Sequence, residues 1–161
     1  MAKRIMIRKG DIFCVEVDTK FKCYFQYIAN DLSQLSSPVI RVFSKHYPMD
    51  YVPNLDEIVT DKVSFYAHTF IKFGLDLNLW HKVGNHKDMG NLDIIYFRWL
   101  EDIGPDIVKS YKWYIWRLNG PTVRVGEMTE EYWDYDIGVV FPCARIINRI
   151  KGGKLLPREI L

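Results

Sequence analysis

Residues 11–29 read DIFCVEVDTKFKCYFQYIA, two apolar runs separated by a short polar turn. Alternation of apolar and polar side chains is typical of strands, and two such runs around a three-residue connection predict a β-hairpin. Because the loop length fixes the register, we expect Val15 to pair with Cys23 and Phe13 with Phe25. This register collects the apolar side chains of both strands on one face.

The same register decides how the cysteines are placed. Cys14 and Cys23 point to opposite faces in it, so no cross-strand disulfide is expected. A two-residue loop would set these cysteines opposite each other, but it would mix Lys20 and Lys22 into the apolar face. With Cys143 the chain has three cysteines, an odd number without paired spacing, which favours a reducing cytoplasm.

Several later segments also carry strand patterns. The cleanest period runs through residues 63–73, which predict one long strand. Further strands are expected over residues 39–43, 94–99, 111–118 and 122–125, and the polar region 74–90 is expected to hold loops with at most one short strand.

Helix signals are fewer. Asn54 can cap a short helical turn, and Thr129 can cap a short helix over residues 129–135. Pro142 suits the first position of a C-terminal helix, whose apolar residues recur with a helical period until Gly152 and Gly153 end it.

These patterns predict a mainly β (α+β) fold in a single domain covering residues 1–161. We expect about seven to nine mostly antiparallel strands in a strongly bent sheet or partial barrel, with one or two short helices including a C-terminal one. The length of 161 residues suffices to bury about 70% of the surface that the unfolded chain exposes.

The formal net charge is only +2, but the charges are unevenly distributed. Basic residues gather near both ends, namely Lys3, Arg4, Arg8, Lys9, Arg145, Arg149, Lys151, Lys154 and Arg158. An acidic block lies between them, which is either a solvated face or a surface matched to a charged partner. No stretch approaches the roughly 18 apolar residues of a membrane span or forms the apolar core of a signal peptide, so we expect a soluble cytoplasmic protein with no membrane partner.

The residue pattern gives little support for a metal site or a reactive cysteine. His81 and His86 flank a glycine loop, but their spacing of five and the lack of a neighbouring cysteine are poor for a metal site. Cys143 follows Pro142 at a helix start, where the dipole favours a thiolate, yet it also fits the apolar stripe of that helix. We expect a buried, inert cysteine and no metal or cofactor.

His68 is the one candidate for a general base. With Arg41 or Lys72 as charge stabiliser it would suit an RNA-cleaving site, although no spacing rule supports that reading. We expect a half-exposed strand histidine instead. Since no phosphate-binding loop or nucleophile motif is present either, we expect a protein that is not an enzyme and has no catalytic residue.

Aromatic residues make up 15% of the chain and crowd residues 111–118 on both strand faces. This strand is therefore either covered on both sides or exposes rings to a partner. Exposed rings interleaved with basic residues would suit single-stranded nucleic acid, and the same residue types are enriched in protein interfaces.

The segments 9–15 (KGDIFCV) and 21–25 (FKCYF) resemble the start of the immunity protein 26 family of bacterial polymorphic toxin systems. The layout of residues 111–125 and 142–150 is similar to the end of that family. The resemblance implies a mostly β protein that binds a cognate toxin protein and blocks it, with no chemistry of its own.

For such a protein we expect a contact surface that is acidic and aromatic, because an inhibitor of a basic nuclease needs charge complementarity and aromatic anchors. The candidate residues are Glu127, Glu130, Glu131, Tyr132, Trp133, Asp134, Tyr135, Asp136 and Trp116. The alternative is a small-barrel nucleic-acid-binding or ribonuclease-type domain, since the opening strand also resembles that of some endoribonuclease toxins with an Src-homology-3-like barrel. An enzyme acting on a small molecule is a third reading. The sequence leaves the oligomeric state open.

Overall fold

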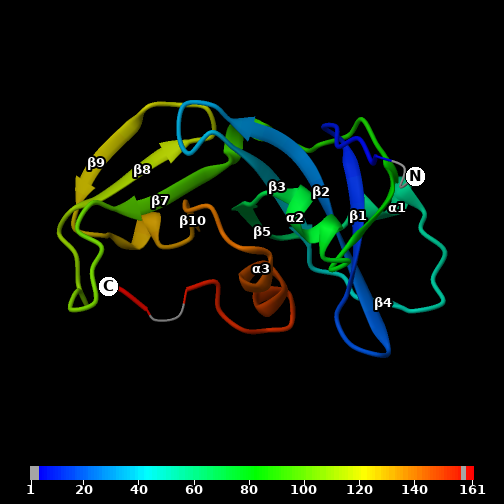
Figure 1. The fold of residues 1–161 in the computed structure, drawn as a ribbon. Helices are drawn as coiled ribbons and strands as arrows, with labels where there is room; N and C mark the ends of the chain where they lie inside the picture. The colour runs from blue at the N-terminus through cyan, green and yellow to red at the C-terminus, as the bar shows by residue number, and fades with distance from the viewer. Residues whose placement is uncertain (1–3, 157–158) are drawn as a thin grey trace.

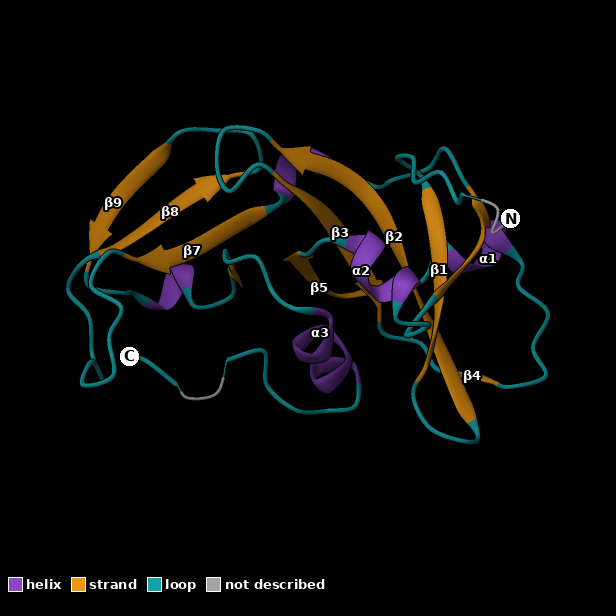
Figure 2. Ribbon diagram, in the orientation of Figure 1, coloured by secondary structure: helices purple, strands orange, loops and turns teal. Residues whose placement is uncertain are grey.

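The computed structural model describes residues 4–156 and 159–161, in which ten strands form two mostly antiparallel sheets (Figures 1 and 2). The first sheet holds β1 (Asp11–Glu16), β2 (Phe21–Asp31), β3 (Ser37–Phe43), β4 (Tyr47–Pro48), β5 (Val63–His68) and β6 (His81–Asn85). The second holds β7 (Tyr96–Leu100), β8 (Trp113–Arg117), β9 (Thr122–Gly126) and β10 (Asp136–Ile137). The helices are α1 (Leu55–Ile58), α2 (Ile71–Asp76) and α3 (Cys143–Ile150), with 3-10 turns η1 (Leu92–Ile94) and η2 (Glu130–Tyr132). The expectation of a mainly β fold with a C-terminal helix is confirmed.

Strand order shows how the two sheets are built. In the first sheet it is β5-β3-β2-β1-β6, with β4 paired to β2, and in the second it is β10-β7-β8-β9. The β10 to β7 pairing is parallel. A hydrogen bond of 3.1 Å from the Tyr66 amide of β5 to Asp136 Oδ2 of β10 ties one sheet to the other.

The β1–β2 hairpin has the register that loop length predicts. Phe13 pairs with Phe25 and Val15 with Cys23. The two phenylalanine rings stack with centroids 5.0 Å apart in the main apolar cluster. Cys14 packs into a different cluster on the other face, and all three cysteines are free.

Apolar clusters cover both faces of the first sheet. One face packs against α2 and α3 through Ile71 and Ile146, whereas the other packs against α1 through Ile58. A third cluster joins Ile28 of β2 to Phe97 of β7, so the core continues from one sheet into the next. The described residues form a single compact domain.

Residues 63–73 do not form the single long strand that their period predicts. The strand ends at His68, and α2 begins at Ile71. The turn is held by Trp80, whose Nε1 donates to the Ile71 carbonyl at 3.0 Å, and Gly74 lets α2 approach the Trp80 ring closely. Ile71 and Gly74 are buried with helical spacing, whereas Phe73, which a strand would place on the same face as Ile71, is 58% exposed.

The local helix signals are confirmed in part. Asn54 caps α1 by accepting a hydrogen bond of 3.2 Å from the Glu57 amide. Thr129 precedes η2 but makes no side-chain cap. Pro142 occupies the N-cap of α3 and not its first helical position, and the helix ends before Gly152, whose φ of 96° suits glycine. No described helix is long and apolar enough to cross a membrane.

Candidate binding surface and cleft

Residues 127–136, which we call the acidic-aromatic segment, follow β9 and end at the first residue of β10. The carboxylates of Glu130, Glu131 and Asp134 are exposed, and no ion pair is found for them within the described residues. Glu127 is exposed as well but pairs with Lys109 at 2.7 Å. The segment therefore presents negative charge that the protein itself leaves largely uncompensated.

Arg98 of β7 holds this segment in place. Its Nε donates to the Tyr135 carbonyl at 2.9 Å, and its guanidinium carbon lies 4.9 Å from the Trp133 ring centroid and 5.3 Å from that of Trp113. The Tyr135 ring also stacks on Tyr96 of β7 with centroids 4.9 Å apart. These contacts fix the segment against the second sheet.

Trp116 does not belong to this surface. Its side chain is only 2% exposed, and its Nε1 donates to Asp31 Oδ2 at 2.8 Å. Trp113, on the other face of β8, is 1% exposed. Both faces of β8 thus carry a buried tryptophan that belongs to the core, whereas Tyr114 is half-buried and Tyr111, just before the strand, is 62% exposed.

A cleft with a volume of about 700 Å³ lies beside the acidic-aromatic segment. It is bounded by β5, β7, β10 and α3, and β10 lies between β7 and α3 in Figure 1. The side chains that define its chemistry are Phe65, Arg98, Trp133, Asp136 and Arg149. Four of the predicted contact residues, Trp133 to Asp136, line it, whereas Glu127, Glu130 and Glu131 lie outside it.

Charged groups in this cleft are partly desolvated. Burial raises the pKa of Asp136 to about 6, although the Tyr66 amide, Arg149 and Arg98 all oppose that shift. Burial also lowers the pKa of Arg98, against the attraction of Asp136 and Glu159. The arginines would have been missed from pattern alone, but one signal exists: Arg98 is a charge in the middle of the aromatic strand sequence YFRWL.

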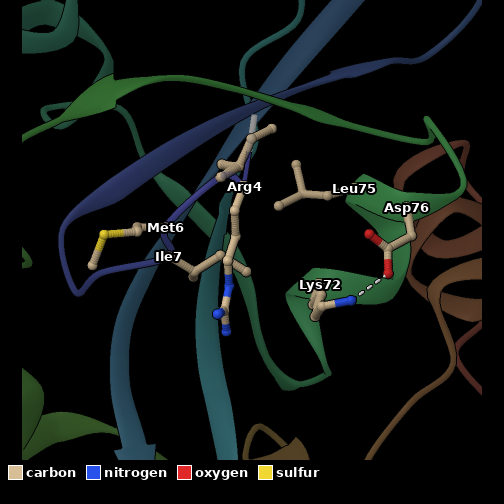
Figure 3. A pocket seen from close by; sticks show the side chains of 7 residues that line it. Arg4, Met6, Ile7, Lys72, Leu75 and Asp76 are labelled. Atoms are coloured by element: carbon tan, nitrogen blue, oxygen red, sulfur yellow. Dashed lines mark hydrogen bonds and ion pairs between the residues drawn. The ribbon is translucent and has the colours of Figure 1, made fainter. Parts of the chain in front are cut away.

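A second cavity of about 720 Å³ lies between the N-terminal segment and α2. Figure 3 shows Arg4, Met6 and Ile7 on one side of it, with Lys72 and the following turn of α2 on the other. Lys72 Nζ already pairs with Asp76 at 2.7 Å. The charged groups of its helical wall therefore pair with each other, and the cavity has fewer unpaired polar groups to bind a ligand than the cleft has.

His68 is completely buried, so the expectation of a half-exposed histidine is wrong. Its Nε2 lies 2.9 Å from Asp31 Oδ2, and both side chains are 0% exposed. Arg41 is only 5% exposed and donates from Nε to Gln26 Oε1 at 2.8 Å. Substrate RNA cannot reach either side chain, and this removes the candidate ribonuclease site.

The other chemical candidates are also accounted for. His86 Nε2 pairs with Asp56 at 2.8 Å, His81 is exposed, and no cluster of three metal-ligating side chains exists among the described residues. Cys143 is 7% exposed, and burial raises the pKa of its thiol, which is the opposite of activation. Of the basic residues near the ends, Lys3 and Arg158 lie outside the described residues.

No family model, curated protein or solved structure matches this chain.

Proposed function

We propose that this protein is a non-catalytic binding protein of the immunity type, which neutralises a cognate bacterial toxin by direct contact in the cytoplasm. The observation that carries the proposal is the acidic-aromatic segment. It exposes the carboxylates of Glu130, Glu131 and Asp134, and Arg98 fixes it to the second sheet. The partner that suits this surface is a protein with a basic face, such as a nuclease.

Rigidity of the segment supports a role in recognition. Binding costs about 0.5–1.5 kcal/mol for each flexible side chain that must be ordered. The stacking of Tyr135 on Tyr96 and the packing of Trp133 against Arg98 remove part of that cost in advance. Exposed like charges on a fixed frame steer an oppositely charged partner and exclude others. The half-buried rings of Tyr132 and Trp133 are of the type that anchors protein interfaces.

The cysteines support a reducing location. Cys14, Cys23 and Cys143 are all buried and unpaired, and Cys14 and Cys23 pack on opposite faces of the first sheet. A protein of this kind keeps its thiols without a disulfide framework in the cytoplasm.

Co-expression with candidate toxin domains from neighbouring genes tests the proposal. Wild-type protein should protect the cells, and the purified pair should form a complex that calorimetry can measure. The triple variant E130K/E131K/D134K should lose protection and bind at least tenfold more weakly, because it turns attraction into repulsion.

A matched control carries the same charge change on exposed acids outside the segment, E16K/D50K/D93K. It should protect like wild type. If both triple variants bind equally well, the segment is not the contact surface. If the wild type instead binds labelled single-stranded RNA, with affinity that falls steeply as salt rises, the nucleic-acid alternative is correct and the immunity proposal is overturned.

A further inference from the structure

Two arginines from distant parts of the chain reach the same cleft. Arg98 comes from β7 and Arg149 from α3. The Arg98 guanidinium packs over Trp113 and Trp133, and the Arg149 guanidinium carbon lies 5.1 Å from the Phe65 ring centroid. Rings fix the plane of a guanidinium while its edge donors stay available for an anion.

Neither arginine has a carboxylate partner within ion-pair distance among the described residues. Arg98 commits its Nε to the Tyr135 carbonyl, and no described group accepts from its terminal nitrogens. No described hydrogen bond involves the Arg149 side chain. Two half-buried cations with unused donors thus face one cavity.

Asp136 is a counter-charge inside the cleft and attracts both arginines. Its Oδ2 already accepts from the Tyr66 amide, and desolvation disfavours its ionised form. The remaining charged residues around the cleft are Asp134, Lys154 and Glu159, all of them exposed. The inner part of the cleft therefore holds two positive charges and one carboxylate.

Space in the cleft exceeds what an inorganic ion needs. A volume of about 700 Å³ falls within the range of small-molecule sites, roughly 300–1,000 Å³. Phe65 and Trp133 supply apolar walls beside the arginines. An acidic head group on an apolar or aromatic body matches this combination.

We propose that the cleft is a binding site for a small organic anion, whose carboxylate, phosphate or sulfonate group is held between Arg98 and Arg149 while its apolar body packs against Phe65 and Trp133. The proposal does not rest on toxin binding: the anion is held by the arginines of the cleft and not by the exposed acids of the acidic-aromatic segment, although Trp133 belongs to both surfaces. The two guanidinium groups, each able to donate to two oxygens of one head group, select an anion over a cation or a neutral ligand.

Titration of the full chain with benzenesulfonate, sulfate and benzyl alcohol tests the site, because the charges of these probes stay constant near neutral pH. Benzenesulfonate should bind more tightly than sulfate, and benzyl alcohol should not bind measurably. In NMR spectra the indole N–H of Trp133 should shift on titration, while that of Trp80, buried against Phe25 in the main core cluster, should not.

Variants then assign the head-group contacts. Arg149→Gln should weaken benzenesulfonate binding by about tenfold, as expected for loss of one charge-assisted contact. Arg145→Gln, on the same helix but outside the cleft, should change it less than twofold. Asp136→Asn should tighten binding, because it removes the competing negative charge.

Three results would overturn the site. They are no benzenesulfonate binding by the wild type at millimolar concentrations, equal losses in the Arg149 and Arg145 variants, and equal affinity for sulfate and benzenesulfonate, which would mean simple ion pairing without a pocket for the organic body. Circular dichroism shows whether each variant is folded, and Arg149→Lys separates charge from fork geometry, since a lysine should restore only part of the affinity.

Discussion

His68 Nε2 lies 2.9 Å from Asp31 Oδ2, and both side chains are fully buried where the first sheet meets the second. Asp31 also accepts from Trp116 Nε1 at 2.8 Å and from the Asn119 amide at 3.3 Å. Burial alone would raise the pKa of Asp31, but the hydrogen bonds with His68 and Trp116 outweigh it and hold the pKa below its usual value. One carboxylate thus joins β2, β5 and β8.

Replacing Asp31 with alanine should destabilise the protein by about 3–5 kcal/mol, because it leaves His68 and the Trp116 indole buried without an acceptor. Urea denaturation followed by tryptophan fluorescence measures this change. The exposed control Asp106→Ala should stay within about 0.5 kcal/mol of wild type. Similar stabilities for both variants would contradict the role of Asp31.

Asp136 should give the stability a distinctive pH dependence. Its pKa is raised from 3.8 to about 6 in the folded state, so the folded protein holds this proton more tightly than the unfolded chain. Asp136 therefore contributes most to the free energy of unfolding below pH 4, and this contribution is lost as the pH rises through 6.

Asp136→Asn removes the cost of ionising a buried carboxyl at this position. Relative to wild type, its free energy of unfolding should increase between pH 4 and pH 7 by up to about 3 kcal/mol, since each pKa unit corresponds to about 1.4 kcal/mol. Denaturant titrations of both proteins at pH 4, 5, 6 and 7 give the difference. A constant difference across that range would show that Asp136 titrates normally.

Arg98→Ala should loosen the acidic-aromatic segment, because it removes the hydrogen bond to the Tyr135 carbonyl and the packing between Trp113 and Trp133. Amide hydrogen exchange should accelerate most in residues 130–136, with little change in β1 and β2. Arg124→Ala is the matched control, since that side chain is 82% exposed and pairs with Glu101. Equal exchange in the two variants would argue against the clamp.

Gly74→Ala tests the turn that ends the expected long strand. A Cβ at this position would lie 1.9 Å from the Trp80 ring, so either α2 or the ring must move. We expect a loss of about 1–3 kcal/mol in the free energy of unfolding, measured by thermal denaturation. At Gly104 a Cβ would meet Ile107 at an ordinary 3.8 Å, and Gly104→Ala should be nearly neutral. A neutral Gly74→Ala would mean that the helix adjusts freely.

The sequence predicts local features of this fold far better than it predicts contacts across it. The pairing of Phe13 with Phe25 follows from the length of one turn and the pattern beside it, and the cap at Asn54 follows from three neighbouring residues. Burial of His68 depends on Asp31, which lies 37 residues away on another strand. The alternation of side chains along β5 therefore does not predict that His68 is buried.

The candidate site shows the same division. The acids of residues 127–136 are visible as a charge pattern, and the exposure of Glu130, Glu131 and Asp134 agrees with it. Trp116 shares its residue type with interface anchors, but its partner Asp31 lies 85 residues away and draws it into the core. Arg98 and Arg149 line one cleft only because α3 packs near β10 and β7, and no local pattern in the sequence predicts that packing.

The junction at Asp31 also bears on the order in which the protein folds. The β1–β2 hairpin closes over three residues, whereas the contacts of Asp31 with His68 and Trp116 close loops of 37 and 85 residues, each at a larger entropic cost. We therefore expect the junction to form after the rate-limiting barrier. Stopped-flow kinetics of Asp31→Asn should then show unfolding that is much faster and folding that is nearly unchanged. The junction would thus slow unfolding of a protein whose folding begins at the hairpin.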